Sequence, residues 1–325
     1  MACGAYLAPV LQILARRIKR LFRKIAVIMN VLAKRASALI PAAVAPTAAS
    51  SVSIHPSAVV APGAKLGAGV LIGPFCTVGA NAVIEDGARL ISHVVVDGHT
   101  RIGAGAMLFP FSTVGLPPQD LKYKGEPTTC DIGAGTQIRE HCSIHRGTAT
   151  GTGATVVGAN CMLMAVVHVA HDCRLGENVI VANNVVMGGH VHIGDFAVIG
   201  GSAALHQFVR IGRAAMVGGV SGVEGDVIPF GSVIGNRARL AGLNVIGLKR
   251  RGFDKVQIQR LRGAFRMLFG ATGVFATRLT ETRARYGADP LVAEILAFID
   301  APSHRGLIRA ALAGAPEGAA AQNSE

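Results

Sequence analysis

The chain has 325 residues, which is enough for one large domain and a smaller one. Aromatic residues make up only 5% and tryptophan is absent, which is typical of a core built from layers of Val, Ile and Leu. The formal net charge of +13 suits phosphates or acidic partners, but no basic surface interleaved with aromatic residues is present, so nucleic-acid binding is not expected. The six cysteines form no CxxC motif and no compact framework, which favours a reducing cytoplasm.

Residues 1–50 form a basic N-terminal extension that contains eight Lys and Arg residues, and the first acidic residue of the chain is Glu85. Apolar residues over 11–35 fall at helical spacing, with the basic residues mostly elsewhere around the helix. This pattern is typical of a membrane-surface helix or of a transit peptide. The other interpretation is a disordered or artefactual segment without a role in function, because Met29 lies inside it and 36–49 reads as an alanine-rich linker. The longest apolar run is shorter than the ~20 residues of a membrane span, so no transmembrane helix is expected.

From Ile54 to Val223 an aliphatic residue returns at every sixth position, with a break at 115–131 and a one-residue slip near 147–153. Neither a helix nor an ordinary amphipathic strand has this period. Short strands joined by small or glycine-rich corners and stacked repeatedly predict a parallel β-helix. Three units make one coil of 18 residues, so residues 18 apart stack at about 4.8 Å, and the repeat predicts roughly nine or ten coils.

The rest of the chain divides around this repeat, which we assign to 51–235. The break at 115–131 is polar and contains two adjacent prolines, Pro117 and Pro118, so it is expected to be a loop that leaves the coil at a corner. Long loops on rigid scaffolds commonly carry function. After about Val233 the period disappears and helical patterns begin, which predicts a small α-helical domain at 236–325 that covers the open edge of the last coil.

The 18-residue period brings scattered polar residues of the second half together. His171, Gly189 and Gln207 stack in one column, Asp172 and His190 occupy the next column, and His206 directly precedes Gln207. One wall of the prism is therefore expected to carry imidazoles over three coils. A single histidine in such a place is usually structural, but several that converge on one wall favour a functional site.

Six segments of the chain carry a more specific resemblance than the repeat does. They are HVVVDGHT (93–100), QDLKYKGEPT (119–128), IHRGT (144–148), HVAHDC (168–173), GGSAALHQF (200–208) and GLKRRGF (247–253). The chain resembles the UDP-N-acetylglucosamine 3-O-acyltransferases, a family of hexapeptide-repeat acyltransferases, from about Val52 to at least Ile308. The resemblance implies a left-handed β-helix that works as a cytoplasmic homotrimer, with the cleft between neighbouring prisms.

The same resemblance implies the reaction. A (3R)-hydroxyacyl group passes from acyl carrier protein to the 3-hydroxyl of UDP-N-acetylglucosamine, the first step of lipid A biosynthesis. The thioester arrives on the 4'-phosphopantetheine of the carrier protein, so no permanently bound cofactor and no metal is expected. A sugar alcohol is a poor nucleophile at neutral pH and needs a positioned base. His171 matches the family base, Asp172 supports that imidazole, and the backbone N–H of Gly189 is the expected oxyanion donor.

The resemblance also implies a set of substrate-binding residues, namely Asp120, Lys122, His145, His168, Asn183, His190, His206, Gln207, Asn244, Arg250 and Arg251. The chain departs from the family pattern at Ile246, where Glu is frequent, and at Arg237, where His is frequent, which leaves nucleotide contacts there open. Gly219 falls where the family sets acyl-chain length, and a small residue there predicts a long hydroxyacyl chain.

In the tail, Lys255, Arg262 and Arg266 fall near one helical face. Our hypothesis is that they dock the acidic carrier protein, and the alternative is an ordinary solvated face.

Three other functions compete with this interpretation. A zinc enzyme of the γ-carbonic anhydrase type would use His168, His171, His190 and His192, but the loop and the GLKRRGF segment have no purpose in it. The related N-acyltransferase of lipid A synthesis has a larger, folded N-terminal domain. The third alternative is a non-catalytic scaffold. Acyl length and a possible 3-amino variant of the acceptor sugar stay open.

Overall fold

The computed structural model describes residues 51–270 and 273–310. The basic extension 1–50, with its predicted helical pattern, lies outside the described residues. Within the described part of the chain, no helix has the length and apolar character that a membrane crossing requires.

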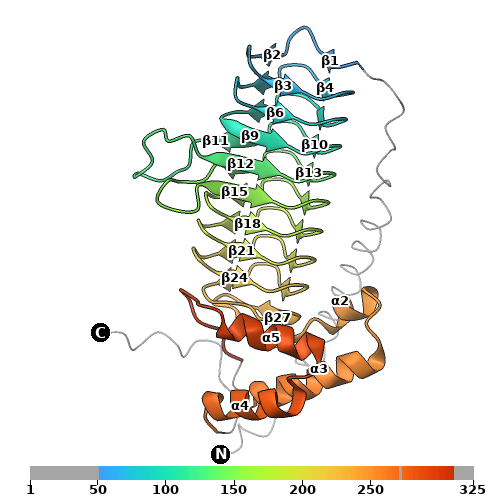
Figure 1. The fold of residues 1–325 in the computed structure, drawn as a ribbon, viewed down its shortest axis with the longest axis vertical. Helices are drawn as coiled ribbons and strands as arrows, with labels where there is room; N and C mark the ends of the chain where they lie inside the picture. The colour runs from blue at the N-terminus through green and yellow to red at the C-terminus, as the bar shows by residue number, and fades with distance from the viewer. Residues whose placement is uncertain (1–50, 271–272, 311–325) are drawn as a thin grey trace, which may run out of the picture. The chain divides into compact units, whose positions relative to one another are not determined.

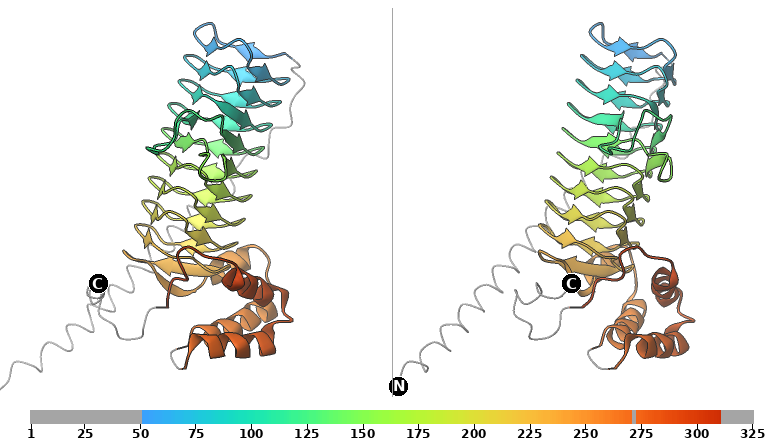
Figure 2. Two further views of the ribbon diagram at one scale, coloured as in Figure 1. Left: turned by 60° about the vertical axis from the view of Figure 1, so that its left-hand side comes forward. Right: turned by 90° about the vertical axis from the view of Figure 1, so that its left-hand side faces the viewer.

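Three sheets, here named A, B and C, form the walls of a β-helix that winds in the left-handed sense (Figures 1 and 2). Their strands pair in parallel, except for the last pair of sheet A, which is antiparallel. Sheet A contains β1 (Ser53–Ile54), β4 (Leu71–Ile72), β7 (Arg89–Leu90), β10 (Met107–Leu108), β13 (Gln137–Ile138), β16 (Met162–Leu163), β19 (Ile180–Val181), β22 (Val198–Ile199), β25 (Met216–Val217), β27 (Gly231–Ile234) and β28 (Arg239–Leu243). Sheet B contains β2 (Val59–Val60), β5 (Thr77–Val78), β8 (Val95–Val96), β11 (Thr113–Leu116), β14 (Ser143–His145), β17 (His168–Val169), β20 (Val186–Met187), β23 (Ala204–Leu205) and β26 (Gly222–Val223). Sheet C contains β3 (Lys65–Leu66), β6 (Val83–Ile84), β9 (His99–Ile102), β12 (Thr129–Ile132), β15 (Ala154–Val157), β18 (Arg174–Leu175), β21 (His192–Ile193) and β24 (Arg210–Ile211).

The aliphatic ladder is the core of the β-helix. In most coils the ladder residue is the inward residue of its strand, and Ile72, Ile84 and Leu90 are at most 1% exposed. Neighbouring strands of one sheet pair in register 18 residues apart, as Ile72 does with Leu90. The predicted left-handed β-helix of hexapeptide repeats is therefore confirmed.

The corners between sheets use two kinds of residue. Many strands are followed by a glycine, because the backbone of the next coil leaves no room for a side chain there. A Cβ on Gly73, for example, would lie 1.8 Å from the carbonyl oxygen of Ile91. The left-handed backbone conformation falls two residues later, where Phe75 has a φ of +57°. The glycine therefore allows close approach of the next coil, and a non-glycine residue two positions later adopts the left-handed backbone conformation.

Both interruptions of the repeat leave the β-helix at the corner between sheets B and C, which we call the BC corner. The loop 115–131 connects β11 to β12, and the segment 147–153 connects β14 to β15. At the second interruption Ser143 pairs with His168, 25 residues later instead of 18, so the corner holds seven additional residues. The one-residue slip predicted from the sequence is this longer insertion.

Among the described residues, the C-terminal part contains four short helices, with α3 and α4 in contact and α5 touching both. They are α2 (Val245–Arg250), α3 (Lys255–Leu268), α4 (Phe275–Tyr286) and α5 (Pro290–Asp300). Asp254 begins α3 with a capping box that includes Gln257, which satisfies backbone N–H groups at the helix start. Arg213 of the β-helix pairs with Glu294 of α5 at 2.6 Å. After α5, the chain returns to the last coil and Leu307 forms a bridge with Asp226.

Candidate active site

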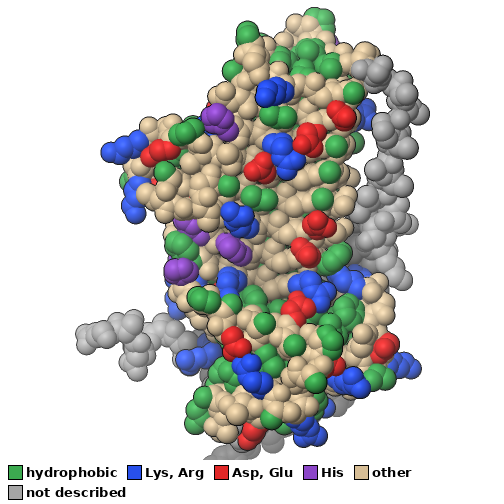
Figure 3. Space-filling view, viewed as in Figure 1, with side chains coloured by type: hydrophobic (Ala, Val, Ile, Leu, Met, Phe, Trp, Pro, Cys, Tyr) green, Lys and Arg blue, Asp and Glu red, His purple; other side chains and the backbone are tan. Residues whose placement is uncertain are grey.

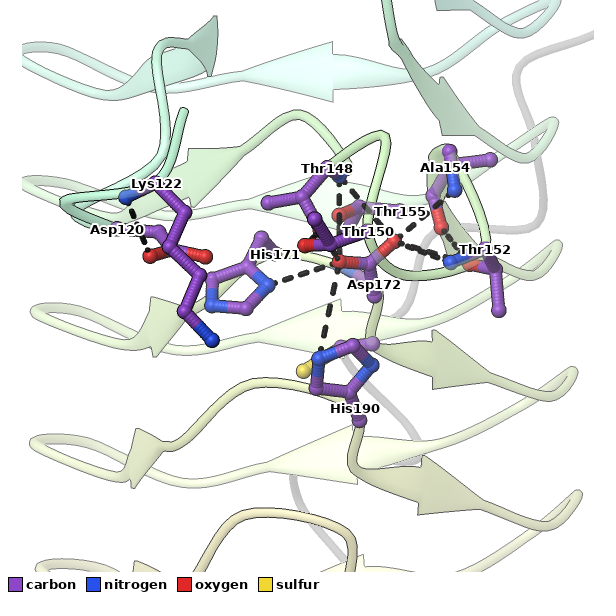
Figure 4. Close-up of polar contacts among 12 residues, drawn as sticks. Asp120, Lys122, Thr148, Thr150, Thr152, Ala154, Thr155, His171, Asp172 and His190 are labelled. Carbon is purple, nitrogen blue, oxygen red and sulfur yellow. Dashed lines mark hydrogen bonds and ion pairs between the residues drawn. The ribbon is translucent and has the colours of Figure 1, made fainter. Parts of the chain in front are cut away.

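A histidine and an aspartate lie side by side at the BC corner after β17. The Nδ1 atom of His171 is 2.8 Å from the Oδ2 atom of Asp172 (Figure 4). The side chain of His171 is 12% exposed and that of Asp172 is fully buried. Asp172 adopts the left-handed conformation with a φ of +60°, which turns its carboxylate back toward the insertion 147–153.

The insertion surrounds the Asp172 carboxylate with hydrogen-bond donors. Thr148 donates from its backbone N–H at 3.2 Å and from its hydroxyl at 2.7 Å. Thr152 donates from its N–H at 2.8 Å and its hydroxyl at 3.1 Å, and Gly153 donates from its N–H at 3.1 Å. Burial alone would raise the pKa of Asp172, but the bonds from His171 and Thr148 outweigh it and hold that pKa well below its usual range. Asp172 is therefore an ionised, acceptor-only group at neutral pH.

Further imidazoles lie next to this pair. His190, one coil later, meets the His171 ring edge-on at a centroid distance of 5.1 Å, and its Nε2 atom is 4.0 Å from Asp172. His168 on β17 shares a 2.7 Å hydrogen bond with Ser143, and His145 packs edge-on against His168. Burial lowers the pKa of His168 and of His190. Burial, followed by the nearby His168 and His171 rings, lowers the pKa of His145 to about 4.

Gly189 lies directly against the His171 ring. A Cβ atom on Gly189 would lie 2.6 Å from Cε1 and 2.8 Å from Nε2 of His171. Any side chain at this position would displace the imidazole or cover its outer nitrogen. The stacked column of His171 and Gly189 predicted from the 18-residue period is present in the structure.

The loop 115–131 supplies two charged residues near the same corner. Asp120 accepts a hydrogen bond at 2.9 Å from the backbone N–H of Lys122, and both residues are labelled beside the histidines in Figure 4. Asp120 also lies close enough to act on the pKa of His190. His206 and Gln207, two coils below His171, belong to the BC corner as well and are exposed.

Other predicted site residues lie at different corners of the same chain. Asn244 and Arg251 contact the corner between sheets C and A, where the Asn244 amide donates to Ala214 and Arg251 donates to Phe196. The oxygen of the Asn244 amide caps α2 by accepting a hydrogen bond from the backbone N–H of Gly247. Arg250 is exposed at the end of α2. Burial, followed by Arg213 and Arg250, lowers the pKa of Arg251.

The remaining predicted residues lie at the corner between sheets A and B. Asn183 and Gly219 follow strands of sheet A and are exposed. Gly201 lies between them in the stack, and a Cβ on Gly219 would lie 3.2 Å from the Gly201 carbonyl oxygen. The two positions where the chain departs from the resembled family, Arg237 and Ile246, are also exposed. One chain alone therefore does not bring all predicted site residues to one place.

The residues that hold the His171–Asp172 pair are not among those that the sequence predicts. Thr148, Thr152 and Gly153 fall within the slip of the repeat, and the length of that slip is the sequence signal that could reveal them. Arg305, which contacts His206 and Gln207 from the C-terminal end of the chain, gave no signal in the repeat.

The donor atoms of His171, Asp172 and His190 lie within 4.8 Å of one another, a spacing that a metal ion could also use. Both Asp172 oxygens, however, already accept several protein N–H and O–H groups. His192, which the zinc alternative also needs, lies on β21 in sheet C, away from His168 in sheet B. The four-histidine set of that alternative is therefore not assembled within this chain.

A left-handed β-helix of six-residue repeats with a buried His–Asp pair at one corner defines a transferase of the hexapeptide-repeat class. The family model described as "Bacterial transferase hexapeptide (six repeats)" matches residues 154–189. A second model, described as "Udp N-acetylglucosamine O-acyltransferase; Domain 2", matches residues 226–308.

Individual relatives specify the family. The acyl-[acyl-carrier-protein]–UDP-N-acetylglucosamine O-acyltransferase of Azorhizobium caulinodans is 54% identical over 78% of this chain and 94% of its own length. The protein of the same name from Bartonella quintana is 51% identical over 77% and 91%. The UDP-N-acetylglucosamine acyltransferase structures from Campylobacter jejuni and Arabidopsis have TM-scores of 0.75 and 0.71 at 38% and 36% identity, and each covers 79% of this chain and at least 99% of its own. The chain belongs to the UDP-N-acetylglucosamine O-acyltransferase family.

Proposed function

We propose that this chain transfers a (3R)-hydroxyacyl group from acyl carrier protein to the 3-hydroxyl of UDP-N-acetylglucosamine, in the first step of lipid A biosynthesis. The observation that carries the proposal is the His171–Asp172 pair, at 2.8 Å, in a chain of this family. A cytoplasmic location fits these substrates and the buried free thiols of Cys76, Cys130 and Cys142.

His171 is the general base. Because ionised Asp172 can only accept, the hydrogen of neutral His171 resides on Nδ1 and the lone pair on Nε2 faces the site. Nε2 removes the proton of the sugar hydroxyl as its oxygen forms a bond to the thioester carbon. The C–S bond then breaks, and the imidazolium returns the proton to the leaving thiolate. Buried Asp172 stabilises the imidazolium between these two steps.

Gly189 is the proposed oxyanion donor. Its backbone N–H makes no backbone hydrogen bond within the residues that the structure describes, and it lies beside the His171 ring. The negative charge that develops on the thioester oxygen requires such a preorganised N–H donor. The absence of a side chain lets the reacting carbonyl approach the main chain.

The working form is proposed to be a homotrimer. Charged residues of both signs are scattered over the outer face of sheet C (Figure 3), including Lys65, Arg101 and Asp131. The outward residues of sheet B include no Lys, Arg, Asp or Glu, and those of sheet A are mostly Leu, Met, Ile and Val. Sheet B, without charged outward residues, and sheet A, where Arg89 and Arg239 are the exposed charged residues, suit a cyclic assembly in which each copy contacts two others. Such packing would also bring Arg251 of one copy toward the BC corner of another.

Acyl-chain selection is assigned to Gly219. This residue lies across sheet B from the BC corner, and the outward residues between them include the half-exposed Val186 and the small Ala204. An apolar path of this kind suits a long hydroxyacyl chain. A panel of hydroxyacyl carrier proteins of increasing length tests the assignment. Gly219→Met is expected to move the preference to shorter chains, and an unchanged preference would show that Gly219 does not set the length.

Carrier-protein docking is assigned to Lys255, Arg262 and Arg266, which are all exposed on α3 and lie 7 and 4 residues apart. This spacing puts them near one face of the helix. Reversing all three charges is expected to raise the KM for the acyl carrier protein while the KM for the nucleotide sugar stays unchanged. An unchanged KM for the carrier protein would reject docking on this face.

The central experiment is an acyl-transfer assay with UDP-N-acetylglucosamine and a series of hydroxyacyl carrier proteins. His171→Ala is expected to lower kcat by about 100- to 10,000-fold, the range that a general base contributes. A parallel reaction with the 3-amino analogue of the sugar nucleotide identifies the preferred acceptor. No bound metal or cofactor is proposed, so metal analysis is expected to find none in stoichiometric amount and chelation is expected to leave kcat unchanged. Full activity of His171→Ala would contradict the mechanism.

A further inference from the structure

The chain segment after α5 is fixed against the end of the β-helix. We call residues 301–310 the C-terminal strap. Its Ser303 hydroxyl donates to Asp226 Oδ2 at 2.6 Å, and the backbone of Asp226 exchanges hydrogen bonds with Gly306 and Ile308. Asp226 is 1% exposed and also pairs with Arg210 at 2.7 Å. A buried and fully paired carboxylate therefore anchors the strap.

The anchored strap brings Arg305 to the BC corner. The Nε atom of Arg305 donates to the carbonyl oxygen of Gln207 at 2.8 Å, and one Nη atom contacts the imidazole of His206. These contacts join residues 98 and 99 positions apart in sequence. The position of the guanidinium is thus determined by the strap and by two residues at the edge of the candidate active site.

The neighbouring His304 connects the strap to the catalytic corner as well. Its ring packs on Phe208 at a centroid distance of 5.0 Å, and Phe208 stacks on His190 at 4.3 Å. His190 in turn contacts His171. His304 of the strap is therefore one end of a column of contacting rings, and the proposed base, His171, is the other end.

The charge of Arg305 has no carboxylate partner within the described residues. The nearest acid that the strap contacts, Asp226, already pairs with Arg210 and accepts from Ser303. The Nη1 group of Arg305 has no hydrogen-bond partner among the residues that the structure describes, and the side chain is exposed. A fixed, exposed guanidinium with free N–H groups matches the geometry of a phosphate group.

We propose that Arg305 binds a phosphate group of a substrate at the BC corner. This inference rests on the proposed function, in which two substrates carry phosphate: the nucleotide sugar has a diphosphate, and the carrier protein has the phosphodiester of its 4'-phosphopantetheine arm. Both groups are anions that a guanidinium binds through paired N–H donors. Arg305 contacts no reacting atom in this assignment, so it contributes binding and leaves the chemical step to His171.

The test compares Arg305→Ala and Arg305→Lys in the full-length protein with Arg309→Ala as the matched control. Arg309 lies on the same strap, is exposed, and its side chain makes no hydrogen bond or ion pair among the described residues. Arg305→Ala is expected to raise the KM of one phosphate-bearing substrate by about 10- to 100-fold, the value of a hydrogen bond to a charged group. The kcat is expected to stay within about threefold, Arg305→Lys to recover part of the loss, and Arg309→Ala to match the wild type.

Separate arms identify the phosphate. A higher KM for UDP-N-acetylglucosamine, together with weaker binding of UDP in calorimetry, assigns Arg305 to the diphosphate. A higher KM for the acyl carrier protein, with UDP binding unchanged, assigns it to the phosphopantetheine arm. UDP binding is measured without turnover, so its loss in Arg305→Ala would support the site even if the transfer reaction itself were absent. Unchanged KM values and UDP affinity, or a fall in kcat and melting temperature that Lys does not relieve, would overturn the proposal and leave Arg305 a structural residue.

Discussion

Asp172→Asn is the sharpest test of the role proposed for the His171–Asp172 pair. The substitution keeps the side-chain volume and shape, and asparagine accepts the φ of +60° that Asp172 adopts. It replaces one acceptor oxygen by an NH₂ donor. The Asp172 carboxylate accepts from six donors: His171 Nδ1, the N–H and hydroxyl of Thr148, the N–H and hydroxyl of Thr152, and the N–H of Gly153. No orientation of the amide can satisfy all of them.

The two amide orientations have different consequences. If the NH₂ group faces His171, that ring must accept on Nδ1, so the hydrogen moves to Nε2 and the proposed base has no lone pair for the substrate. If the NH₂ group faces Thr152 and Gly153, two backbone N–H groups lose their acceptor. An unsatisfied buried donor costs about 1–3 kcal/mol. We therefore expect kcat to fall by about 100- to 10,000-fold and the free energy of unfolding to fall by about 2–5 kcal/mol.

The assay measures kcat in Asp172→Asn, His171→Ala and the double variant. If Asp172 acts through His171, the second substitution is expected to add almost nothing, because residues that act as a unit are non-additive. Asp195→Asn is the matched control, since Asp195 also accepts a backbone N–H across coils, from Glu177 at 2.8 Å, but lies at another corner. The control is expected to keep the wild-type kcat.

The pH dependence of stability gives an independent readout. The pKa of Asp172 is lowered in the folded state, so its contribution to stability is present above the unfolded pKa of about 3.9 and is lost as the pH falls below it. Asp172→Asn is expected to lose this part of the acid dependence. A kcat within about threefold of wild type, or additive effects in the double variant, would refute the proposed role of Asp172.

Three further variants follow from the geometry. His145→Gln removes an imidazole whose pKa is lowered to about 4 in the folded state. The wild type is therefore expected to lose as much as ~3 kcal/mol of stability between pH 6.5 and 4, and the variant is expected to keep it. Thermal melts at several acidic pH values measure the difference. Gly189→Ala places a methyl group 2.6 Å from the His171 ring, and steady-state kinetics are expected to show kcat about 100-fold lower; wild-type kinetics would mean that the ring is not displaced. Glu294→Gln removes the half-exposed ion pair with Arg213, and thermal melting is expected to show a loss of about 1 kcal/mol or less.

The sequence predicts the β-helix well because one physical requirement repeats in every coil. An inward position such as Ile84 or Leu90 accepts only a side chain that fills a triangular core, so the period of six appears directly in the sequence. The stacking of His171 on Gly189 follows from the same period, since 18 residues make one coil. Residues related by the repeat are therefore predictable as neighbours without coordinates.

The contacts that tune the site are not related by the repeat. Thr148 and Thr152 reach Asp172 across 24 and 20 residues because seven extra residues fold back at one corner, and the direction of such a fold depends on local hydrogen bonds. In the sequence, these two threonines are visible only as part of a shift in the phase of the six-residue repeat. Arg305 reaches His206 only after the chain has passed through four helices, so no spacing rule connects the two.

The position of the site follows from a limitation of the fold itself. A coil of short parallel strands has flat walls and small corners. The surfaces that enclose a substrate must therefore come from interruptions of the coil or from another copy of the chain. The loop 115–131, the insertion 147–153 and the C-terminal strap all meet the prism at the BC corner, where they supply Asp120, the donors around Asp172, and Arg305. The remaining proposed contacts, at Arg251 and Gly219, lie at the other two corners. A single prism therefore carries its predicted site residues at three separate corners, and cyclic packing of identical prisms is the arrangement that would bring different corners together in every copy at once.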